Sequence, residues 1–453
     1  MKNVLLTVCM LLLSTFVGTM MLETSAGATP VSDRTSVVRP ILPDSVSLPA
    51  DSTQSSSYSQ VAVHDTLTRA FPDSTNAQEN VDERFLRVVR QELSALLENP
   101  LFEQTQLGLC IYDLTADRMV FQSGMKQRMR PASTMKAITA ICAIDELGAQ
   151  FEFSTEIRSD VSVTIDTLRT NLYIKGQMDP LFGKDDLQRF VALLLDSAVT
   201  CWRGNLVLDA TLKDTLPAGW GWCWDDENPS LSPLMCDGQD VLAATFAEVL
   251  QANNIHWDGQ VQYGAAPDSS VCLMRIKHSL DQVLLPMLKK SNNQMAECLF
   301  YRIAAASGNK FAQRSDAADR MNRIIRKQLD LSPDDYQIAD GSGLSLYNYV
   351  SPELMVSLLR YAFEREDIFR HLYPALPIMG VDGTLKKRCK GAPAQSKVVA
   401  KTGTVNGVSA LMGYATTAHG HTLCFGIINQ GVVSSKLGRN FQDEVCNVLT
   451  RIY

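Results

Sequence analysis

The spacing of hydrophobic positions changes several times along the chain, and each change predicts a different kind of element. From Phe85 to Leu97, apolar side chains recur every three or four residues with charges between them, which predicts an amphipathic helix. Residues 106–113 and 119–122 are short runs rich in β-forming side chains, and they predict two strands joined by a turn. The folded part of the chain is therefore expected to begin with a helix and a hairpin.

The C-terminal part predicts the same two kinds of element. Residues 409–416 and 422–428 have the pattern of adjacent antiparallel strands, and residues 441–452 that of a closing helix with one apolar face. Helical periodicity also fills much of the region from 280 to 366. Helices at both ends of a chain that finishes in an antiparallel meander predict an α/β fold, in which helices cover an antiparallel sheet.

Residues 152–236 follow a different pattern, and we predict that they form a β-rich inserted domain. Short β-rich runs alternate there with polar turns. Within this stretch, Gly219–Asp226 places three tryptophans at every second position. That spacing fits an extended segment that covers apolar surface, and it also fits an aromatic platform for a sugar or a peptide. On this division the main domain is discontinuous and comprises residues 81–151 and 237–453.

The N-terminal 28 residues have the features of a secretory signal peptide. Lys2 precedes an apolar run from Val4 to Val17, and Ala26-Gly-Ala28 offers a cleavage site of small residues. Residues 29–80 are rich in Ser, Thr, Pro and Asp, and they predict a disordered linker. We therefore expect a protein that is exported to the periplasm or another part of the cell envelope.

Composition narrows the class of protein. The chain has 453 residues, 45% of them hydrophobic, and a formal net charge of −7, which argues against a nucleic-acid partner. The eleven cysteines include no Cys-x-x-Cys motif. Cys223 and Cys236, on either side of a Trp- and Pro-rich loop, are the pair that we expect to form a disulfide. The six histidines are scattered, so we expect no metal and no cofactor.

The segment Pro131–Ala140 carries the strongest chemical signal. Ser133 and Lys136 are three residues apart, and Pro131 stands just before them, where a helix start is favoured. Residues i and i+3 share one face of a helix, so the amine lies within reach of the hydroxyl. Serine needs a neighbouring base to become a nucleophile, and lysine can be that base when burial or a nearby cation lowers its pKa. We predict that Ser133 attacks a carbonyl group and that Lys136 takes its proton.

The Ser-x-x-Lys pattern alone does not single out this pair. Ser123/Lys126 and Ser307/Lys310 match the pattern as well. The apolar residues that follow Ser133 at helical spacing distinguish it, because they predict that its helix is buried.

Two further motifs stand later in the chain. Ser291-Asn-Asn293 lies between two predicted helices, and Lys401-Thr-Gly403 lies at the end of an apolar strand. The Lys-Thr-Gly motif occurs only once in the sequence, whereas the Ser-x-Asn pattern recurs elsewhere. Gly403 has no side chain, so a substrate backbone can come close to the strand there.

In this order, the three motifs resemble those of penicillin-binding proteins and class A β-lactamases. Further segments extend the resemblance: Gly176–Pro180, Asp340–Ser345, Val381–Leu385 and Lys401–Val408. From about residue 81 to the C-terminus, the chain resembles the low-molecular-mass penicillin-binding proteins of the D-alanyl-D-alanine carboxypeptidase/endopeptidase type, peptidase family S13. The resemblance implies the serine β-lactamase/DD-peptidase-like transpeptidase fold, with an antiparallel sheet, a helical subdomain and an inserted domain.

The resemblance also implies catalytic roles. Ser133 is the acylated nucleophile, and Lys136 is its general base. Ser291 relays a proton to the leaving group. Asn293 holds the substrate amide and Lys136. Asn292, in the middle of the motif, stands where the family often has Asp, and this side chain has no part in the implied chemistry.

Further residues are implied to bind the substrate. Lys401 supplies positive charge for the terminal carboxylate of the substrate, and Thr402 donates a hydrogen bond to it. The backbone N–H groups of Ser133 and Thr404 form the oxyanion hole. Asp179 is placed as a further substrate contact from the inserted domain.

The implied function is hydrolysis of D-Ala-D-Ala termini or D,D-cross-bridges in peptidoglycan stem peptides, with β-lactam antibiotics as acylating agents. One alternative is a serine β-lactamase on the same fold, but the sequence has no Glu-x-x-Leu-Asn signature for a deacylating carboxylate. The other is a non-enzymatic envelope-binding module, which the loss of one of the motifs would have favoured.

Overall fold

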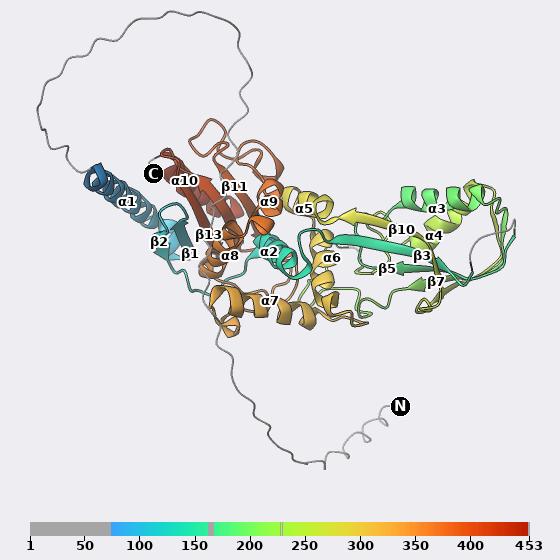
Figure 1. Ribbon diagram of the computed structural model, residues 1–453. Helices are drawn as coiled ribbons and strands as arrows, with labels where there is room; N and C mark the ends of the chain where they lie inside the picture. Colours follow the sequence, from blue (N-terminus) through green and yellow to red (C-terminus); the bar gives the residue numbers. More distant parts are fainter. Residues whose placement is uncertain (1–73, 162–166, 227, 229, 452–453) are drawn as a thin grey trace, which may run out of the picture. The chain divides into compact units, whose positions relative to one another are not determined.

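The computed structural model describes residues 74–161, 167–226, 228 and 230–451 (Figure 1). The predicted signal peptide, residues 1–28, and the linker as far as residue 73 lie outside these ranges. Residues 74–80, which we assigned to the linker, instead form the first turns of helix α1 (Ser74–Leu97). Their sequence is almost wholly polar, so hydrophobic periodicity could not detect the helix there. In the part of the chain that the structure describes, no helix is long and apolar enough to cross a lipid bilayer.

The main sheet consists of five antiparallel strands in the order β11-β12-β13-β1-β2. Its strands are β1 (Gln106–Asp113), β2 (Arg118–Ser123), β11 (Val398–Val405), β12 (Val408–Thr416) and β13 (Thr422–Gln430). β1 pairs with β13 along its whole length, from Gln106 opposite Gln430 to Asp113 opposite Leu423. Strands from both parts of the chain therefore share one sheet, which confirms the predicted antiparallel sheet.

Helices pack on both faces of this sheet. α1 and α10 (Ser435–Arg451) lie on one face, where Val89 and Val445 belong to a single buried cluster with the strand side chains that point toward them. α8 (Pro352–Glu364) packs against β13 and β1 on the other face. Successive strand residues point to opposite faces, so a sheet buried on both sides needs apolar residues throughout, as β12 and β13 have.

A group of helices adjoins the sheet and supplies part of the site described below. Its members are α2 (Met135–Leu147), α5 (Leu280–Lys289), α6 (Asn293–Ala304), α7 (Arg314–Leu329) and α9 (Glu366–Ala375). α2 contacts each of the other four, and every residue from Met135 to Ile144 is buried. The prediction of a buried helix after Ser133 is therefore confirmed.

A second five-stranded sheet lies in the inserted region, in the order β10-β3-β5-β7-β9. Its strands are β3 (Glu152–Ser159), β5 (Leu172–Gly176), β7 (Leu206–Asp209), β9 (Val261–Tyr263) and β10 (Val271–Ser279). Our boundary at residue 236 is wrong, because β9 and β10 complete the sheet that β3 begins. β10 runs antiparallel to β3 from Val271 opposite Ser159 to Ser279 opposite Glu152. The inserted region therefore comprises residues 152–279.

Two helices, α3 (Lys184–Asp196) and α4 (Leu242–Ala252), cover one face of this second sheet (Figure 1). A small parallel sheet accompanies it, formed by β4 (Thr167–Leu168), β6 (Cys201–Trp202) and β8 (His256–Trp257). The predicted disulfide is wrong, since Cys223 and Cys236 are both free thiols. Cys236 is buried in the core between the sheet and its helices, whereas Cys223 is exposed in the loop.

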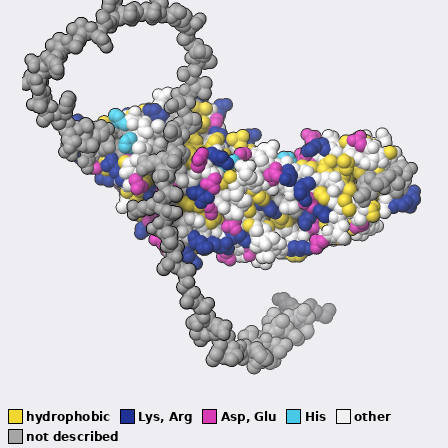
Figure 2. All heavy atoms as spheres, in the orientation of Figure 1, with side chains coloured by type: hydrophobic (Ala, Val, Ile, Leu, Met, Phe, Trp, Pro, Cys, Tyr) yellow, Lys and Arg dark blue, Asp and Glu magenta, His cyan; other side chains and the backbone are white. Residues whose placement is uncertain are grey.

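Acidic and basic side chains intermingle over the face of the molecule shown in Figure 2, with hydrophobic side chains between them. No field of one sign covers that face.

Candidate active site

Ser133 lies in a short 3-10 turn, Ala132–Thr134, that leads directly into α2. Ala132 has a φ of 46°, in the left-handed region that residues with a side chain seldom adopt. Such strain persists only where the surrounding structure holds it, and it is common at functional sites. The Nζ atom of Lys136, one turn later, lies 2.9 Å from Ser133 Oγ. The structure thus brings the two residues of the predicted pair together.

Lys136 is fully buried and is surrounded by hydrogen-bond acceptors rather than by ion-pair partners. Besides Ser133, its Nζ donates to Asn293 Oδ1 at 2.7 Å and to the carbonyl oxygen of Ser342 at 2.7 Å. Burial lowers the pKa of Lys136 to about 8, although the nearby carboxyl groups of Asp340 and Glu297 oppose this shift. A substantial fraction of the amine is therefore neutral near physiological pH and able to accept a proton.

The second motif joins α5 to α6. Ser291 has a φ of 60°, and Asn292 caps α6 by accepting a hydrogen bond from the Met295 N–H at 3.0 Å. Asn292 therefore has a structural role in this turn. Asn293 begins α6, and its Nδ2 donates to Asn228 Oδ1 at 3.3 Å, while its Oδ1 accepts from Lys136.

The third motif lies on β11. Lys401 is fully buried, and its Nζ donates to Ser291 Oγ at 2.9 Å and to the carbonyl oxygen of Thr402 at 2.7 Å. Burial and the charge of Lys136 hold the pKa of Lys401 well below its ordinary value. The site thus contains two serine–lysine pairs, Ser133 with Lys136 and Ser291 with Lys401, and Asn293 contacts the first of them.

The edge of β11 runs directly against the turn that carries Ser133. A Cβ atom on Gly403 would lie 2.7 Å from the carbonyl oxygen of Pro131 and 3.1 Å from the Ser133 nitrogen. Only glycine allows this approach. Thr404, the next residue, is exposed beside that turn, and an oxyanion hole built from the N–H groups of Ser133 and Thr404 needs this closeness.

A protein-family model for the D-Ala-D-Ala carboxypeptidase 3 (S13) family matches residues 89–235 and 230–452. The chain belongs to this S13 family. It is 26% identical over 414 residues to the D-alanyl-D-alanine carboxypeptidase DacB of Haemophilus influenzae, an alignment that covers 73% of this chain and 86% of that protein. A D-alanyl-D-alanine carboxypeptidase of an Actinomadura species is 26% identical over 444 residues, which cover 76% of this chain and 81% of the relative.

The fold is also that of a solved structure of a penicillin binding protein. The crystal structure of penicillin binding protein 4 from Haemophilus influenzae superimposes with a TM-score of 0.71, covering 78% of this chain and 97% of that one at 24% identity. This likeness shows the fold, whereas the family model and the named carboxypeptidase relatives show that the chain is a serine hydrolase.

One predicted site residue of this S13 chain does not join the cluster. The Asp179 side chain is fully buried, and its Oδ2 lies 2.8 Å from His278 Nδ1 on β10. Our expectation that Asp179 contacts the substrate is wrong, because its carboxylate is inaccessible. Hydrogen bonding to Asp179 raises the pKa of His278, so the pair joins the turn after β5 to β10.

The loop at Asp340–Ser345 contributes groups to which the sequence analysis assigned no role. Asp340 accepts hydrogen bonds from the backbone N–H groups of Gly343 at 2.8 Å and Ser345 at 2.7 Å. Glu297, buried on α6, accepts from the Ser342 N–H at 2.8 Å. These bonds hold the Ser342 carbonyl where it accepts from Lys136. Glu297 follows Asn293 by four residues on one helix face, and that spacing was the available signal.

Glu297 is an uncharged carboxyl group over much of the physiological range. Burial and the neighbouring charge of Asp340 raise the pKa of Glu297 well above its ordinary value. When Glu297 is neutral, it no longer raises the pKa of Lys136, and of these two groups only Asp340 opposes the effect of burial on that lysine.

A further unassigned residue, Thr384, lies beside the third motif. The hydroxyl of Thr402 donates to Thr384 Oγ1 at 2.8 Å, and this pair is exposed. Thr384 stands in Val381–Leu385, a segment noted for its resemblance to the family but without a role. Two hydroxyls therefore lie side by side next to Lys401.

The tryptophan-rich loop does not form a strand, and its three indoles have different surroundings. Trp222 donates from Nε1 to Asp340 Oδ2 at 2.9 Å. Trp220 packs against Tyr347 with 4.8 Å between ring centroids, whereas the Trp224 side chain is 97% exposed. Only Trp222 among the three therefore bonds to the loop at Asp340. The three indoles do not share one face, although they stand at alternate positions in the sequence.

Proposed function

We propose that this S13 family enzyme is a serine D,D-carboxypeptidase and endopeptidase, which cleaves D-Ala-D-Ala termini or D,D-cross-bridges of peptidoglycan stem peptides through an acyl-enzyme. The observation that carries the proposal is the Ser133–Lys136 pair, with 2.9 Å between the hydroxyl and a buried amine of lowered pKa. The relatives named as D-alanyl-D-alanine carboxypeptidases and as a penicillin binding protein support this class of substrate.

In the acylation step, the neutral amine of Lys136 accepts the hydroxyl proton of Ser133 while Oγ attacks the scissile carbonyl carbon. The backbone N–H groups of Ser133 and Thr404 stabilise the negative oxygen of the tetrahedral intermediate. Ser291 then passes its hydroxyl proton to the departing amine as the C–N bond breaks. The proton that Lys136 took from Ser133 replaces it on Ser291, so Lys136 is neutral again for the second step. The hydrogen bond from Lys401 to Ser291 orients that hydroxyl for the transfer.

In the deacylation step, water attacks the ester carbonyl and Lys136 accepts a proton from it. The ester C–O bond breaks, and the proton returns to Ser133 Oγ, which restores the resting enzyme. A β-lactam follows the first step, because its strained amide presents the same carbonyl carbon. Its leaving nitrogen stays tethered to the acyl group, which favours slow release and a lasting adduct.

Substrate binding falls to the groups around β11. The free carboxylate of the terminal D-alanine meets the hydroxyls of Thr402 and Thr384, with the charge of Lys401 close behind them. Arrival of this anion raises the pKa of Lys401 and so draws a proton onto it. Asn293 has an amide group next to Lys136, placed to hold the substrate backbone.

The proposed place of action is the periplasm or another compartment of the cell envelope, where peptidoglycan is found. The apolar N-terminal run and its small-residue cleavage site support export. Peptidoglycan stem peptides and β-lactams are the proposed partners.

The proposal is tested by the intact mass of the protein after incubation with benzylpenicillin, followed over time for the wild type and Ser133→Ala. A stable adduct of one penicillin that the variant lacks supports the proposal, and release of D-alanine from a stem pentapeptide then completes the case. Rapid turnover of the drug without an adduct would instead indicate a β-lactamase. Labelling of a correctly folded Ser133→Ala protein would refute the assignment of the nucleophile.

A further inference from the structure

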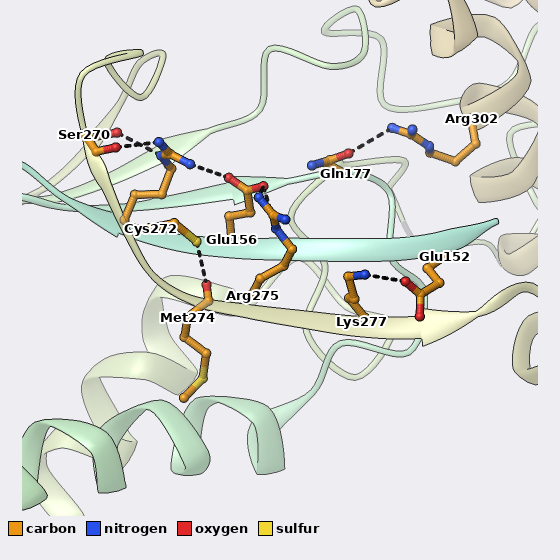
Figure 3. A network of polar contacts seen from close by, with 10 residues as sticks. Glu152, Glu156, Gln177, Ser270, Cys272, Met274, Arg275, Lys277 and Arg302 are labelled. Carbon is orange, nitrogen blue, oxygen red and sulfur yellow. Dashed lines mark hydrogen bonds and ion pairs between the residues drawn. The ribbon is translucent and has the colours of Figure 1, made fainter. Parts of the chain in front are cut away.

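The face of the second sheet that points away from α3 and α4 carries a network of charged side chains (Figure 3). Glu156 accepts from Arg158 at 2.7 Å and from Arg275 at 3.0 Å, and Lys277 pairs with Glu152. Each of these three cations therefore has a carboxylate partner, which is what charges that leave bulk water require.

Arg302, at the margin of this network, has no such partner. Figure 3 shows Arg302 and Gln177 pointing toward one another, but the bond from Nη1 to Gln177 Oε1 is long, at 3.4 Å. The guanidinium also lies 5.2 Å from the ring centroid of Phe151. Its Nε is buried without a hydrogen-bond partner, and no carboxylate among the described residues forms an ion pair with it.

Other arginines with a buried, unpartnered nitrogen differ from Arg302 in one respect. Arg360 forms an ion pair with Asp117, and Arg388 forms one with Asp443. Burial without an opposing carboxylate lowers the pKa of Arg302 to about 10. Its position in the last turn of α6 favours a positive charge through the helix dipole, but that interaction leaves the buried Nε unsatisfied.

Arg302 lines a cavity of about 230 Å³. The polar side chains around it are Lys175, Gln177, Asp209, Thr211, Arg302, Asn309 and Lys310. Neither lysine forms an ion pair within the described part of the chain, although Lys175 has Glu156 and Asp209 as its neighbours across the sheet. Lys310 comes from the third Ser-x-x-Lys match along the chain, Ser307-Gly-Asn-Lys310, which has no place in the proposed catalysis.

The single carboxylate in the lining is already occupied. Asp209 Oδ1 accepts from the Thr211 N–H at 3.0 Å and from the Thr211 hydroxyl at 2.6 Å, and its Oδ2 accepts from the Ala266 N–H at 2.9 Å. Three cationic side chains therefore line the cavity, namely Lys175, Arg302 and Lys310. The one carboxylate in the lining, Asp209, is already hydrogen-bonded to Thr211 and Ala266.

The cavity is separate from the catalytic cluster. Asn293 begins α6 and Arg302 lies in its last turn. At about 100° and 1.5 Å per residue, the two side chains leave opposite sides of the helix, about 14 Å apart along its axis. A ligand of the cavity therefore does not compete with the substrate for the groups around Ser133.

We propose that the cavity at Arg302, Gln177 and Lys310 is a second binding site of this protein, for an oxyanion. A guanidinium presents paired N–H groups that match the two oxygens of a carboxylate or phosphate, and the ammonium of Lys310 adds charge. A bound oxyanion would satisfy the group that the fold leaves without a partner. The cavity is smaller than a typical ligand pocket, so it takes a small anion or the anionic end of a larger ligand. Carboxylate ends of peptides and phosphate groups of envelope polymers or lipids are the two sources of that chemistry.

The test uses isothermal titration calorimetry of the full folded chain with citrate and, separately, with inorganic phosphate. Arg302→Met and Lys310→Ala are expected to weaken binding of the preferred anion by about tenfold or more, since each removes a charged hydrogen-bond donor. Arg326→Met, which removes the same charge from an exposed position on α7, is the matched control and should bind like the wild type. The anion that binds identifies the source.

Three results would overturn the proposal: no binding of either anion, equal binding by the wild type and both variants, or loss of binding in Lys401→Ala instead. Melting temperature supplies a separate readout. Because the wild type holds a largely buried cation without a carboxylate partner, Arg302→Met should melt at the same or a higher temperature in anion-free buffer. A large drop for Arg302→Met but not Arg326→Met would assign Arg302 to structure alone. The test does not depend on catalysis, so its failure would leave the proposed function in place.

Discussion

The indole Nε1 of Trp222 donates a hydrogen bond of 2.9 Å to the carboxylate of Asp340. Trp222 belongs to the inserted region, and Asp340 belongs to the loop whose Ser342 carbonyl accepts from Lys136 at 2.7 Å. The inserted region therefore contacts the group that orients the proposed general base. Besides forming a sheet of its own, the inserted region thus helps to hold the catalytic residues in position.

Trp222→Phe tests this relationship. The variant keeps an aromatic ring but loses the indole N–H donor, so Asp340 is less firmly held and the Ser342 carbonyl can move away from Lys136. A bond to a charged acceptor contributes about 1.5–3 kcal/mol, and we expect acylation by a fluorescent penicillin to slow by about tenfold. Trp224→Phe, at an exposed position, is the control. Equal rates for both variants would mean that the bond to Asp340 has no part in catalysis.

The rate of acylation should depend on pH through Lys136. With a pKa of about 8, the amine is mostly protonated at pH 7 and mostly neutral at pH 9. Only the neutral form accepts the proton of Ser133, so the second-order rate should rise by about tenfold per unit below pH 7 and level off above pH 8. Stopped-flow acylation from pH 5.5 to 9.5 measures the profile. Lys136→Arg, whose guanidinium stays protonated, should be inactive throughout. A flat wild-type profile would exclude Lys136 as the base.

Lys401→Ala should impair substrates that end in a carboxylate more than their amidated analogues, because the variant lacks the positive charge behind the Thr402 hydroxyl. The ratio of kcat/KM for a stem pentapeptide and for its C-terminal amide measures this. Equal losses for both substrates would remove Lys401 from carboxylate recognition.

Thr384→Val should raise KM for carboxylate-terminated peptides by about tenfold, since a hydroxyl that bonds the anion is replaced by a methyl group. Thr384→Ser keeps the hydroxyl and should remain close to the wild type. If Thr384→Val also leaves KM unchanged, its contact with Thr402 is a surface feature without a role in binding.

Gly403→Ala should disturb the nucleophile turn directly. The added Cβ would lie 2.7 Å from the Pro131 carbonyl oxygen and 3.1 Å from the Ser133 nitrogen, so β11 and the turn must separate. Overpacking of this kind typically costs about 1–3 kcal/mol, and we expect both a lower melting temperature and slower acylation. Gly264→Ala is the control, because its Cβ would meet only an ordinary contact at 3.6 Å. Normal acylation by Gly403→Ala would argue against an oxyanion hole at this edge.

Glu297 should tolerate a neutral isostere. Its raised pKa means that the carboxyl group is largely uncharged at pH 7, so Glu297→Gln keeps both the charge state and the acceptor for the Ser342 N–H. We expect melting temperature and acylation near those of the wild type. Glu297→Leu leaves that N–H buried and unsatisfied, and should lose about 1–3 kcal/mol of stability. If the two variants are equally damaged, the negative charge of Glu297 matters after all.

Much of this protein follows from local spacing in the sequence. The Ser133–Lys136 approach needs only three residues of helical geometry, and the strands β12 and β13 and the closing helix follow from alternation and from an apolar face. The resemblance to the S13 family predicted that the three motifs form one site, which local spacing alone does not predict. Their catalytic roles stay predictions until the variants above are measured.

Long-range packing decided the rest. Asp179 looked available in its turn, yet His278 on β10 holds it in the interior. The true end of the inserted region became visible only when β10 paired with β3. Likewise Ser342 and Glu297, far apart in sequence, meet because α6 and the Asp340 loop pack together. A pattern along the chain determines which face of an element is apolar, but which element that face meets depends on the whole fold.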